Sequence, residues 1–207
     1  MFEINETLEM DVDLENNLYT IDNFYEDPDI IVDYLNKQYS PLHKSGDAGY
    51  NGISFEDRRY VEYNDIINPV YRLVAEITGQ EPDGGGGIEI SVNKWRGIKR
   101  NLNDYENYYW WPHTDEGYTA LVYLNKDDES NGTNLYEVIR NYTVGDEITE
   151  HKYPWQPKIN YRVIKKISPR YNRMVIFNGL CYHGMNICDD RYFNSEYRLN
   201  QVFFFKK

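Results

Sequence analysis

Residues 110–115 read WWPHTD, and residues 173–186 read RMVIFNGLCYHGMN. The chain contains only four histidines, yet one of them lies two residues before an aspartate and another follows an apolar, strand-like run. Side chains at positions i and i+2 of an extended segment point to the same face, so His113 and Asp115 can converge on one ion. His183 is the best candidate for a third ligand, because the turn after the apolar run allows a neighbouring strand to deliver it. Taken singly, each histidine is more typical of a hydrogen-bonded structural residue; together the three residues predict a metal site.

Two imidazoles and one carboxylate form a ligand set with a chemical meaning. Such a facial triad leaves coordination positions open and suits Fe(II) that must bind both a cosubstrate and oxygen. A closed structural zinc site would need four protein ligands, and the sequence contains no pair of cysteines with zinc-finger spacing. Cys181 lies two residues from His183, so an alternative ligand set that includes this thiol stays open. The pattern favours iron over zinc.

Short strand patterns surround these motifs from residue 88 to residue 207. Ile88, Ile90 and Val92 alternate with polar residues, which is the period of a half-buried strand. Many short strands after two helices indicate an antiparallel sandwich or barrel with helices packed outside. Further strands are predicted over residues 118–124, 133–139, 161–167, 174–177 and 199–205.

The N-terminal part of the chain carries helical patterns instead. After a short predicted strand over residues 18–21, Asp27 and Pro28 supply the N-cap and first position of a helix predicted over residues 28–39. Apolar residues spaced three and four apart predict a second helix that runs from Ile66 and stops at Gly79.

The boundary between the two parts lies near four consecutive glycines, residues 84–87. This run lacks the Lys-Ser/Thr pair of a P-loop and the spacing of a dinucleotide fingerprint, so it predicts a flexible turn. We expect residues 1–87 to form an α/β region that packs on a core of residues 88–207, in one compact domain overall.

Composition and charge exclude several classes of protein. A chain of 207 residues with 41% hydrophobic and 16% aromatic residues is typical of a globular protein. The formal net charge of −12 disfavours nucleic acid as a partner, although residues 94–100 and 165–173 are locally basic. The apolar runs are too short for a membrane span, and the N-terminus lacks the features of a signal peptide, so we expect a cytoplasmic protein. Cys181 and Cys188 are too few for a disulfide framework.

The order of the motifs resembles that of the 2-oxoglutarate- and Fe(II)-dependent oxygenases, and is most similar to their prolyl-hydroxylase-like branch. In that family a His-x-Asp motif precedes a strand that ends in Tyr-Leu-Asn, which residues 120–125 (ALVYLN) match. A Gly-Gly-x-Leu element usually follows. Residues 132–135 match it imperfectly, because Thr133 takes the place of the second glycine.

The rest of the resemblance lies near the C-terminus. An apolar strand that ends in Phe leads through a turn to the distal histidine, as residues 173–179 lead to His183. An arginine then opens the last strand, as Arg198 does here after a longer gap of 15 residues. Arg191 competes for this role, but it lies in a polar segment, whereas Arg198 heads an apolar strand.

The resemblance implies a mainly β fold with flanking helices around a double-stranded β-helix, the jelly-roll core that is also found in cupins. It implies that His113, Asp115 and His183 bind Fe(II), that 2-oxoglutarate is the cosubstrate and that O2 is the oxidant. Arg198 and Tyr123 are then expected to bind the far carboxylate of 2-oxoglutarate. Physical chemistry supports this role for Arg198, because a buried carboxylate is costly unless a cation such as guanidinium pairs with it.

The sequence therefore predicts an oxygenase that hydroxylates an unidentified protein side chain or small molecule. Two alternatives stay open. A non-catalytic β-barrel binding or structural module would be expected to have gaps among the triad and Arg198, and none is present. A cupin-like metalloenzyme that does not use 2-oxoglutarate would give Arg198 and Tyr123 no special role.

Overall fold

The computed structural model describes residues 3–37, 54–62, 68–79, 90–98, 112–126, 129–139, 160–194 and 196–205. At residues 34–36, 54–62, 68, 90–98 and 194 it describes the backbone alone. The predicted glycine turn at residues 84–87 and the tryptophans at positions 110 and 111 lie outside these ranges.

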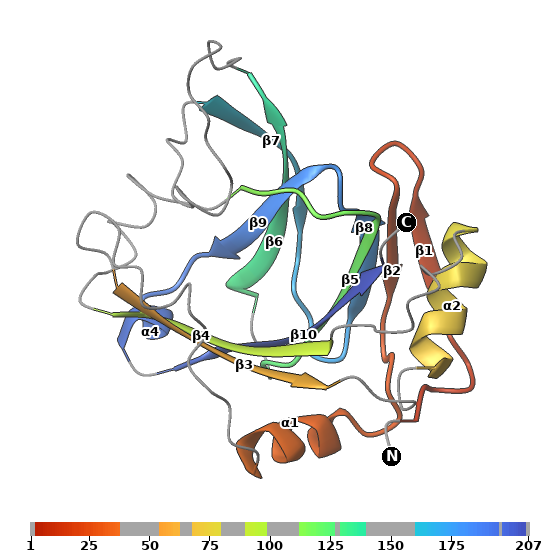
Figure 1. Cartoon of the computed structure of the whole chain (residues 1–207), viewed down its shortest axis with the longest axis horizontal. Coiled ribbons are helices and arrows are strands. Elements are labelled where there is room, and N and C mark those ends of the chain that lie inside the picture. The colour runs from red at the N-terminus through yellow and green to blue at the C-terminus, as the bar shows by residue number, and fades with distance from the viewer. Residues whose placement is uncertain are drawn as a thin grey trace.

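The strands lie in two sheets (Figure 1). One sheet has seven strands in the order β1-β2-β8-β5-β10-β4-β3, and the other has three in the order β7-β6-β9. Every pairing between these strands is antiparallel. The strands are β1 (Met10–Asp13), β2 (Leu18–Ile21), β3 (Ser54–Glu62), β4 (Ile90–Ile98), β5 (Tyr118–Tyr123), β6 (Asn131–Val138), β7 (Tyr161–Ile167), β8 (Met174–Asn178), β9 (Tyr182–Ile187) and β10 (Arg198–Phe205).

Capping residues mark the start of one helix and the end of another. Helix α1 (Pro28–Lys37) starts after Asp27, whose carboxylate accepts a hydrogen bond from the Asp29 N–H at 3.1 Å. Helix α2 (Asn68–Thr78) carries its proline in the first turn and ends at Gly79, which has a φ of +66°. A third, short helix is α4 (Arg191–Asn194). The prediction of a mainly β fold with flanking helices is confirmed.

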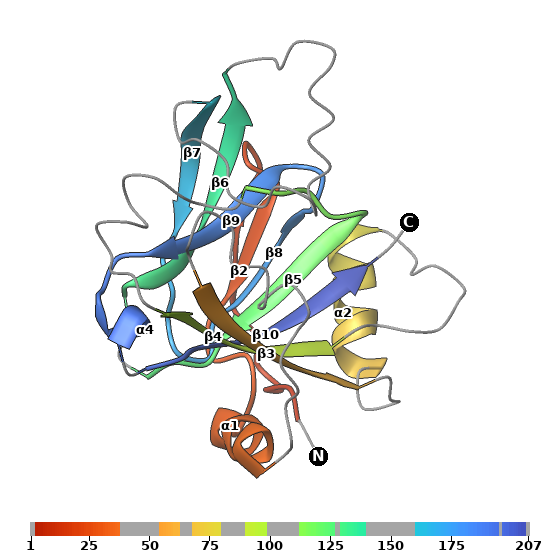
Figure 2. The same cartoon turned by 60° about the vertical axis from the view of Figure 1, so that its left-hand side comes forward.

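Alternate residues of β5 belong to two different cores. Ala120 and Val122, with Leu124 just after the strand, pack with apolar residues of α1 and α2. Leu121 and Tyr123 instead belong to a cluster with residues of β6 and β7. The helices therefore cover one face of the seven-stranded sheet, and the three-stranded sheet covers the other. Figure 2 shows α2 beside β5 and β10.

The structure contains four elements that the sequence pattern did not predict: β1, β3, β9 and α4. The most important of these is β9, because His183 was expected to follow a turn and instead lies within this strand. Strand β9 pairs with β6 from Tyr182 to Ile187, so its partner strand, and not its own composition, makes it regular. None of the described helices has the length and apolar character needed to cross a bilayer.

Candidate metal centre

Backbone hydrogen bonds bring the two histidine-containing segments side by side. The His113 N–H donates to the His183 carbonyl at 2.9 Å, and the His183 N–H donates to the His113 carbonyl at 2.8 Å. Two residues further on, the Asp115 N–H donates to the Gly179 carbonyl at 2.8 Å. The positions of all three predicted ligands are therefore set by the backbone before their side chains are considered.

Gly179 is required for this close approach. A Cβ atom at this position would lie 2.8 Å from the Gly117 carbonyl oxygen and 2.9 Å from that of Asp115, closer than real Cβ atoms come to backbone. A glycine has no Cβ, so the turn after β8 can pack directly against the segment that holds Asp115.

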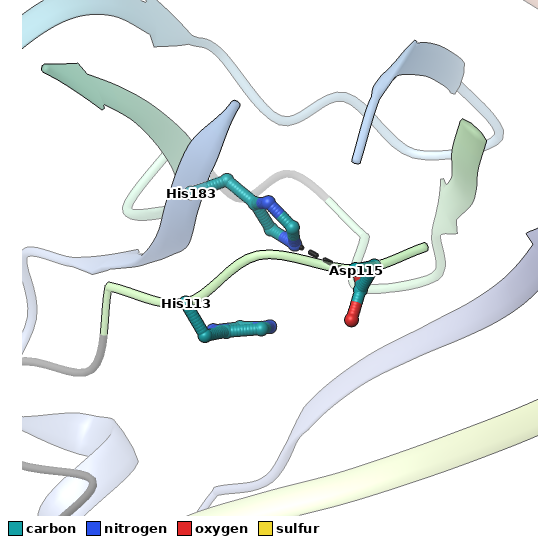
Figure 3. Close-up of side chains that lie close together, drawn as sticks. All are labelled: His113, Asp115 and His183. Carbon is teal, nitrogen blue, oxygen red and sulfur yellow. Dashed lines mark hydrogen bonds and ion pairs between the residues drawn. The ribbon is translucent and has the colours of Figure 1, made fainter. Parts of the chain in front are cut away.

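The three side chains point toward one another, as Figure 3 shows. Their potential ligand atoms all lie within 4.8 Å of one another. The His183 Nε2 atom is 3.1 Å from Asp115 Oδ2, and the rings of His113 and His183 have centroids 4.4 Å apart. Among the described residues, this is the only group of three or more histidine, cysteine or acidic side chains that could hold a metal ion.

A hydrogen bond at Nδ1 determines which ring nitrogen of His183 is free to bind a metal. Its Nδ1 atom lies 2.9 Å from the Cys181 carbonyl oxygen, which only accepts hydrogen bonds, so Nδ1 carries the hydrogen. In the neutral ring, Nε2 then has a lone pair directed at the Asp115 carboxylate. Nε2 and the Asp115 carboxylate are then two acceptors that face each other, so a proton or a cation must lie between them. A backbone carbonyl that accepts from the other ring nitrogen is also a usual partner of a metal-binding histidine.

Asp115 is an anion in this environment. Burial alone would raise the pKa of its carboxyl group. When the two imidazoles carry protons, a hydrogen bond from His183 Nε2, the positive charges of both rings and the Thr119 hydroxyl outweigh burial and lower that pKa to about 2. The Thr119 hydroxyl donates to Oδ2 at 2.9 Å. Thr119 is therefore a positioning residue for the carboxylate, one that the sequence motif did not reveal.

The thiol of Cys181 is not part of the group. Its sulfur lies 3.8 Å from the Tyr136 carbonyl oxygen and 3.7 Å from that of Tyr182, and it packs against the core between the sheets. The backbone carbonyl of Cys181 takes part in the site, and the side chain does not. The alternative ligand set with a thiolate is not what the structure brings together.

Arg198 and Tyr123 both reach from the seven-stranded sheet to β6. The buried guanidinium of Arg198 donates from Nε to the Asn131 carbonyl at 2.9 Å and from Nη2 to the Gly132 carbonyl at 3.4 Å. The Tyr123 hydroxyl donates to Thr133 Oγ1 at 2.9 Å. Burial raises the pKa of Tyr123 to about 12, although the hydrogen bond to Thr133 opposes that rise, so the phenol stays neutral.

The competing arginine lies in a different environment. Arg191, on α4, donates to the Ser130 hydroxyl at 3.1 Å, and its Nε atom is 3.6 Å from the Asp189 carboxylate and 3.9 Å from the Glu196 carboxylate. About a third of its side chain is exposed, 31% against 4% for the whole Arg198 residue. Arg191 is engaged with two acidic residues of its own segment and with a hydroxyl just before β6.

No protein-family model and no curated protein matches this sequence. Comparison with solved structures finds chains of similar fold. An oxidoreductase of the 2OG-Fe(II) oxygenase family from Burkholderia pseudomallei aligns over 92% of this chain and 84% of its own, with a TM-score of 0.52 and 10% identity. The epimerase SnoN, in complex with Fe3+, alpha ketoglutarate and nogalamycin RO, aligns over 92% of this chain and 79% of its own, with a TM-score of 0.51 and 13% identity. At these identities the likeness is one of fold.

Proposed function

We propose that this chain is an Fe(II)- and 2-oxoglutarate-dependent oxygenase that hydroxylates a protein side chain or a small molecule. The observation that carries the proposal is the group formed by His113, Asp115 and His183, with ligand atoms within 4.8 Å and with His183 held in the metal-binding tautomer. Two neutral nitrogens and one carboxylate oxygen are the donor set of the non-haem Fe(II) oxygenases. His113, Asp115 and His183 therefore supply the ligand types that Fe(II) takes in such sites.

The strand order supports a double-stranded β-helix core. In the seven-stranded sheet β8, β5, β10 and β4 are neighbours, and in the other sheet β7, β6 and β9 are neighbours, followed by the bridge from β9 to His113. The chain thus crosses repeatedly between two antiparallel sheets, as in a jelly roll. With the order of the motifs, we assign the chain to the prolyl-hydroxylase-like branch as part of the proposal.

Arg198 and Tyr123 would form the far end of the cosubstrate site. Thr119, which contacts Asp115, and Tyr123 lie on the same face of β5, four residues or roughly 13 Å apart. The residue that contacts the metal group, Thr119, and the residue at the far end of the site, Tyr123, therefore lie along the inner face of the same strand. A buried guanidinium at one end and an open metal group at the other suit a dicarboxylate that chelates the metal with one end.

When bound, iron and 2-oxoglutarate would supply the activation of O2 that hydroxylates a C–H bond, with 2-oxoglutarate converted to succinate and carbon dioxide. The chain's own residues hold and shield this chemistry. Phe177 packs against His183 with ring centroids 4.8 Å apart, and Leu121 and Val175 add apolar surface to the same inner core. Phe177 therefore covers part of the His183 ring with apolar surface.

Anaerobic titration with Fe(II) and 2-oxoglutarate tests the proposal. We expect a visible metal-to-ligand charge-transfer band in the wild type and none in Asp115→Ala. Arg198→Ala should lose affinity for 2-oxoglutarate while its affinity for Fe(II) is mostly kept, and Arg191→Ala, the matched control, should behave as the wild type.

The outcomes separate the competing functions. A metal affinity without any band would favour a cupin-like metalloenzyme that does not use 2-oxoglutarate. Absence of metal binding would favour a binding or structural module. If Arg191→Ala loses 2-oxoglutarate and Arg198→Ala keeps it, the assignment of the arginine is wrong.

A further inference from the structure

The hydroxyl of Tyr123 is already committed within the protein. A tyrosine has one O–H proton, and Tyr123 donates it to Thr133 Oγ1 at 2.9 Å. Both residues are buried, and burial keeps the phenol in its protonated form. In this arrangement the same proton is not available to a second acceptor, so the hydroxyl that can donate to a ligand carboxylate is that of Thr133 and not that of Tyr123.

Thr133 is held firmly where the hydroxyl of Tyr123 meets it. It lies in β6, the middle strand of its sheet, opposite Ile167 on β7 and Met185 on β9. The preceding residue, Gly132, packs so closely that an added Cβ would lie 2.3 Å from the Ile167 carbonyl oxygen. The carbonyl of Gly132 also accepts a hydrogen bond from Arg198. Two consecutive residues of β6 therefore contact the far end of the proposed site: Gly132 contacts Arg198, and Thr133 contacts Tyr123.

The Thr133 hydroxyl keeps a proton of its own. A hydroxyl can accept one hydrogen bond and still donate another. Among the residues that the structure describes, its hydrogen-bond partner is Tyr123, whose oxygen donates to it. Thr133 therefore has a donor available in an environment from which water is largely excluded.

A second side chain on the same face, that of Asn200, has a buried oxygen with no hydrogen-bond partner among the described residues. Asn200 lies directly opposite Tyr123 in the pairing of β10 with β5, so the two side chains share a face. Its Oδ1 atom is buried, and within the described part of the chain it has no hydrogen-bond partner. Since buried polar atoms are rarely left unpaired, a water molecule or a ligand is expected to complete the polar surroundings here.

We propose that Thr133 donates the hydrogen bond to the far carboxylate of a 2-oxo dicarboxylate, beside Arg198, and that Tyr123 is a positioning residue behind it. This rests on the proposed function, because it assigns the cosubstrate to the same site. It revises the role expected of Tyr123, and it gives a role to the position where a glycine of the Gly-Gly-x-Leu element is replaced.

Calorimetric titration of the Mn(II)-loaded protein with two acids tests the assignment. 2-Oxopentanoate keeps the chelating end of 2-oxoglutarate but carries a methyl group in place of the far carboxylate. Thr133→Val, which keeps the shape and removes the hydroxyl, should bind 2-oxoglutarate about tenfold more weakly or worse and 2-oxopentanoate as the wild type does. Thr133→Ser should keep most of the affinity, and Thr78→Val, on α2, is the matched control.

Variants of Tyr123 test whether this residue acts only through Thr133. If Tyr123 acts only through Thr133, Tyr123→Phe should weaken 2-oxoglutarate binding less than Thr133→Val does. Adding Tyr123→Phe to Thr133→Val should then cost no further affinity. Unchanged Mn(II) affinity in each variant shows that the metal end has not been disturbed.

The binding results separate a failure of the proposed function from a failure of the role proposed for Thr133. If the wild type binds 2-oxoglutarate no more tightly than 2-oxopentanoate, the proposed function fails. If the wild type discriminates but Thr133→Val binds 2-oxoglutarate normally while Tyr123→Phe does not, Tyr123 contacts the carboxylate and the role of Thr133 is overturned. An equal loss of both acids in Thr133→Val overturns it as well, because the residue would then act at the metal end or on the fold.

Discussion

The orientation of one imidazole ring decides whether the three side chains can bind a metal. His183 is fixed by the Cys181 carbonyl on Nδ1, and Asp115 is fixed by the Thr119 hydroxyl on Oδ2. Groups in contact with the ligands in this way commonly change metal affinity by 10- to 100-fold when they are removed. The backbone carbonyl cannot be removed by substitution, so His183 keeps its tautomer through any side-chain change at position 181.

Metal binding should weaken on the acidic side of neutrality because of the histidines and not because of Asp115. The pKa of Asp115 is lowered to about 2, against about 3.9 in an unfolded chain. A lowered pKa means that this carboxylate stabilises the fold above about pH 4, and that its contribution is lost only as the pH falls toward 2. His113 and His183 must be neutral to bind a cation, and free imidazole takes up a proton near pH 6.5.

We therefore expect Mn(II) affinity to be constant at alkaline pH and to fall as the pH is lowered, by up to about 100-fold per pH unit once both imidazoles carry protons, because both protons must then be lost on metal binding. Titration by electron paramagnetic resonance at a series of pH values measures this. A profile that stays flat down to about pH 5 would contradict ligation by the histidines.

At the scale of single elements, helices were easier to predict than strands. Asp27 with Pro28 and the glycine at position 79 mark helix ends in the sequence, and both helices begin and end within about two residues of their predicted limits. The sequence YHGMNI of β9 has neither alternation nor a run of branched residues, so nothing local marks it as a strand. Its regularity comes from its pairing with β6, which only the folded chain provides.

The same reasoning applies to the candidate site. The triad could be found because the His-x-Asp spacing and the distal histidine are visible as letters in a definite order. Thr119, the carbonyl of Cys181 and the contact between Tyr123 and Thr133 could not, because each depends on which strands become neighbours. The sequence marked position 133 only as a departure from a motif.

One turn residue joins the N-terminal segment to the inner strands. Asn172 lies between β7 and β8 with a φ of +62°, and its amide accepts from the Tyr25 N–H at 2.9 Å and donates to the Tyr25 carbonyl at 2.8 Å. Its backbone N–H donates to the Tyr123 carbonyl at 2.9 Å, next to the proposed ligand site. The Phe24 N–H also donates to the Asn172 carbonyl at 2.9 Å, so the turn links residues 24 and 25 to the end of β5.

Asn172→Ala should lower the free energy of unfolding by about 2–4 kcal/mol. It loses two buried hydrogen bonds of about 1 kcal/mol each, and alanine, unlike asparagine, has no side-chain amide that favours a positive φ. Asn172→Gly removes the backbone strain and isolates the loss of the bonds. Asn23, with a φ of +52°, is the matched control, since Asn23→Ala should carry the strain alone, about 1 kcal/mol. Urea denaturation measures all three variants; equal losses in Asn172→Ala and Asn23→Ala would refute the link.

Across the whole molecule, residues from both ends of the sequence build the same cores. The cluster under the helices contains Ile21, Phe24 and Ile31 together with Phe203 and Phe205. Strands β1, β2 and β3 are members of the seven-stranded sheet that also holds β5, β8 and β10. We therefore propose that residues 1–87 and 88–207 form one cooperative unit and not two domains that unfold separately.

The tryptophans provide a test of that unity, because all four lie between residues 95 and 155, within the second part of the chain. Ile31, on α1 in the first part, is 1% exposed, so Ile31→Ala should cost about 3 kcal/mol through lost burial and the cavity left behind. If the chain is one unit, the tryptophan fluorescence transition in urea should shift by this full amount and coincide with the transition seen by circular dichroism. Ile30→Ala, at the neighbouring and 41% exposed position, is the control and should shift neither signal appreciably. A fluorescence transition unmoved by Ile31→Ala would show that the part bearing the metal centre folds without the N-terminal part.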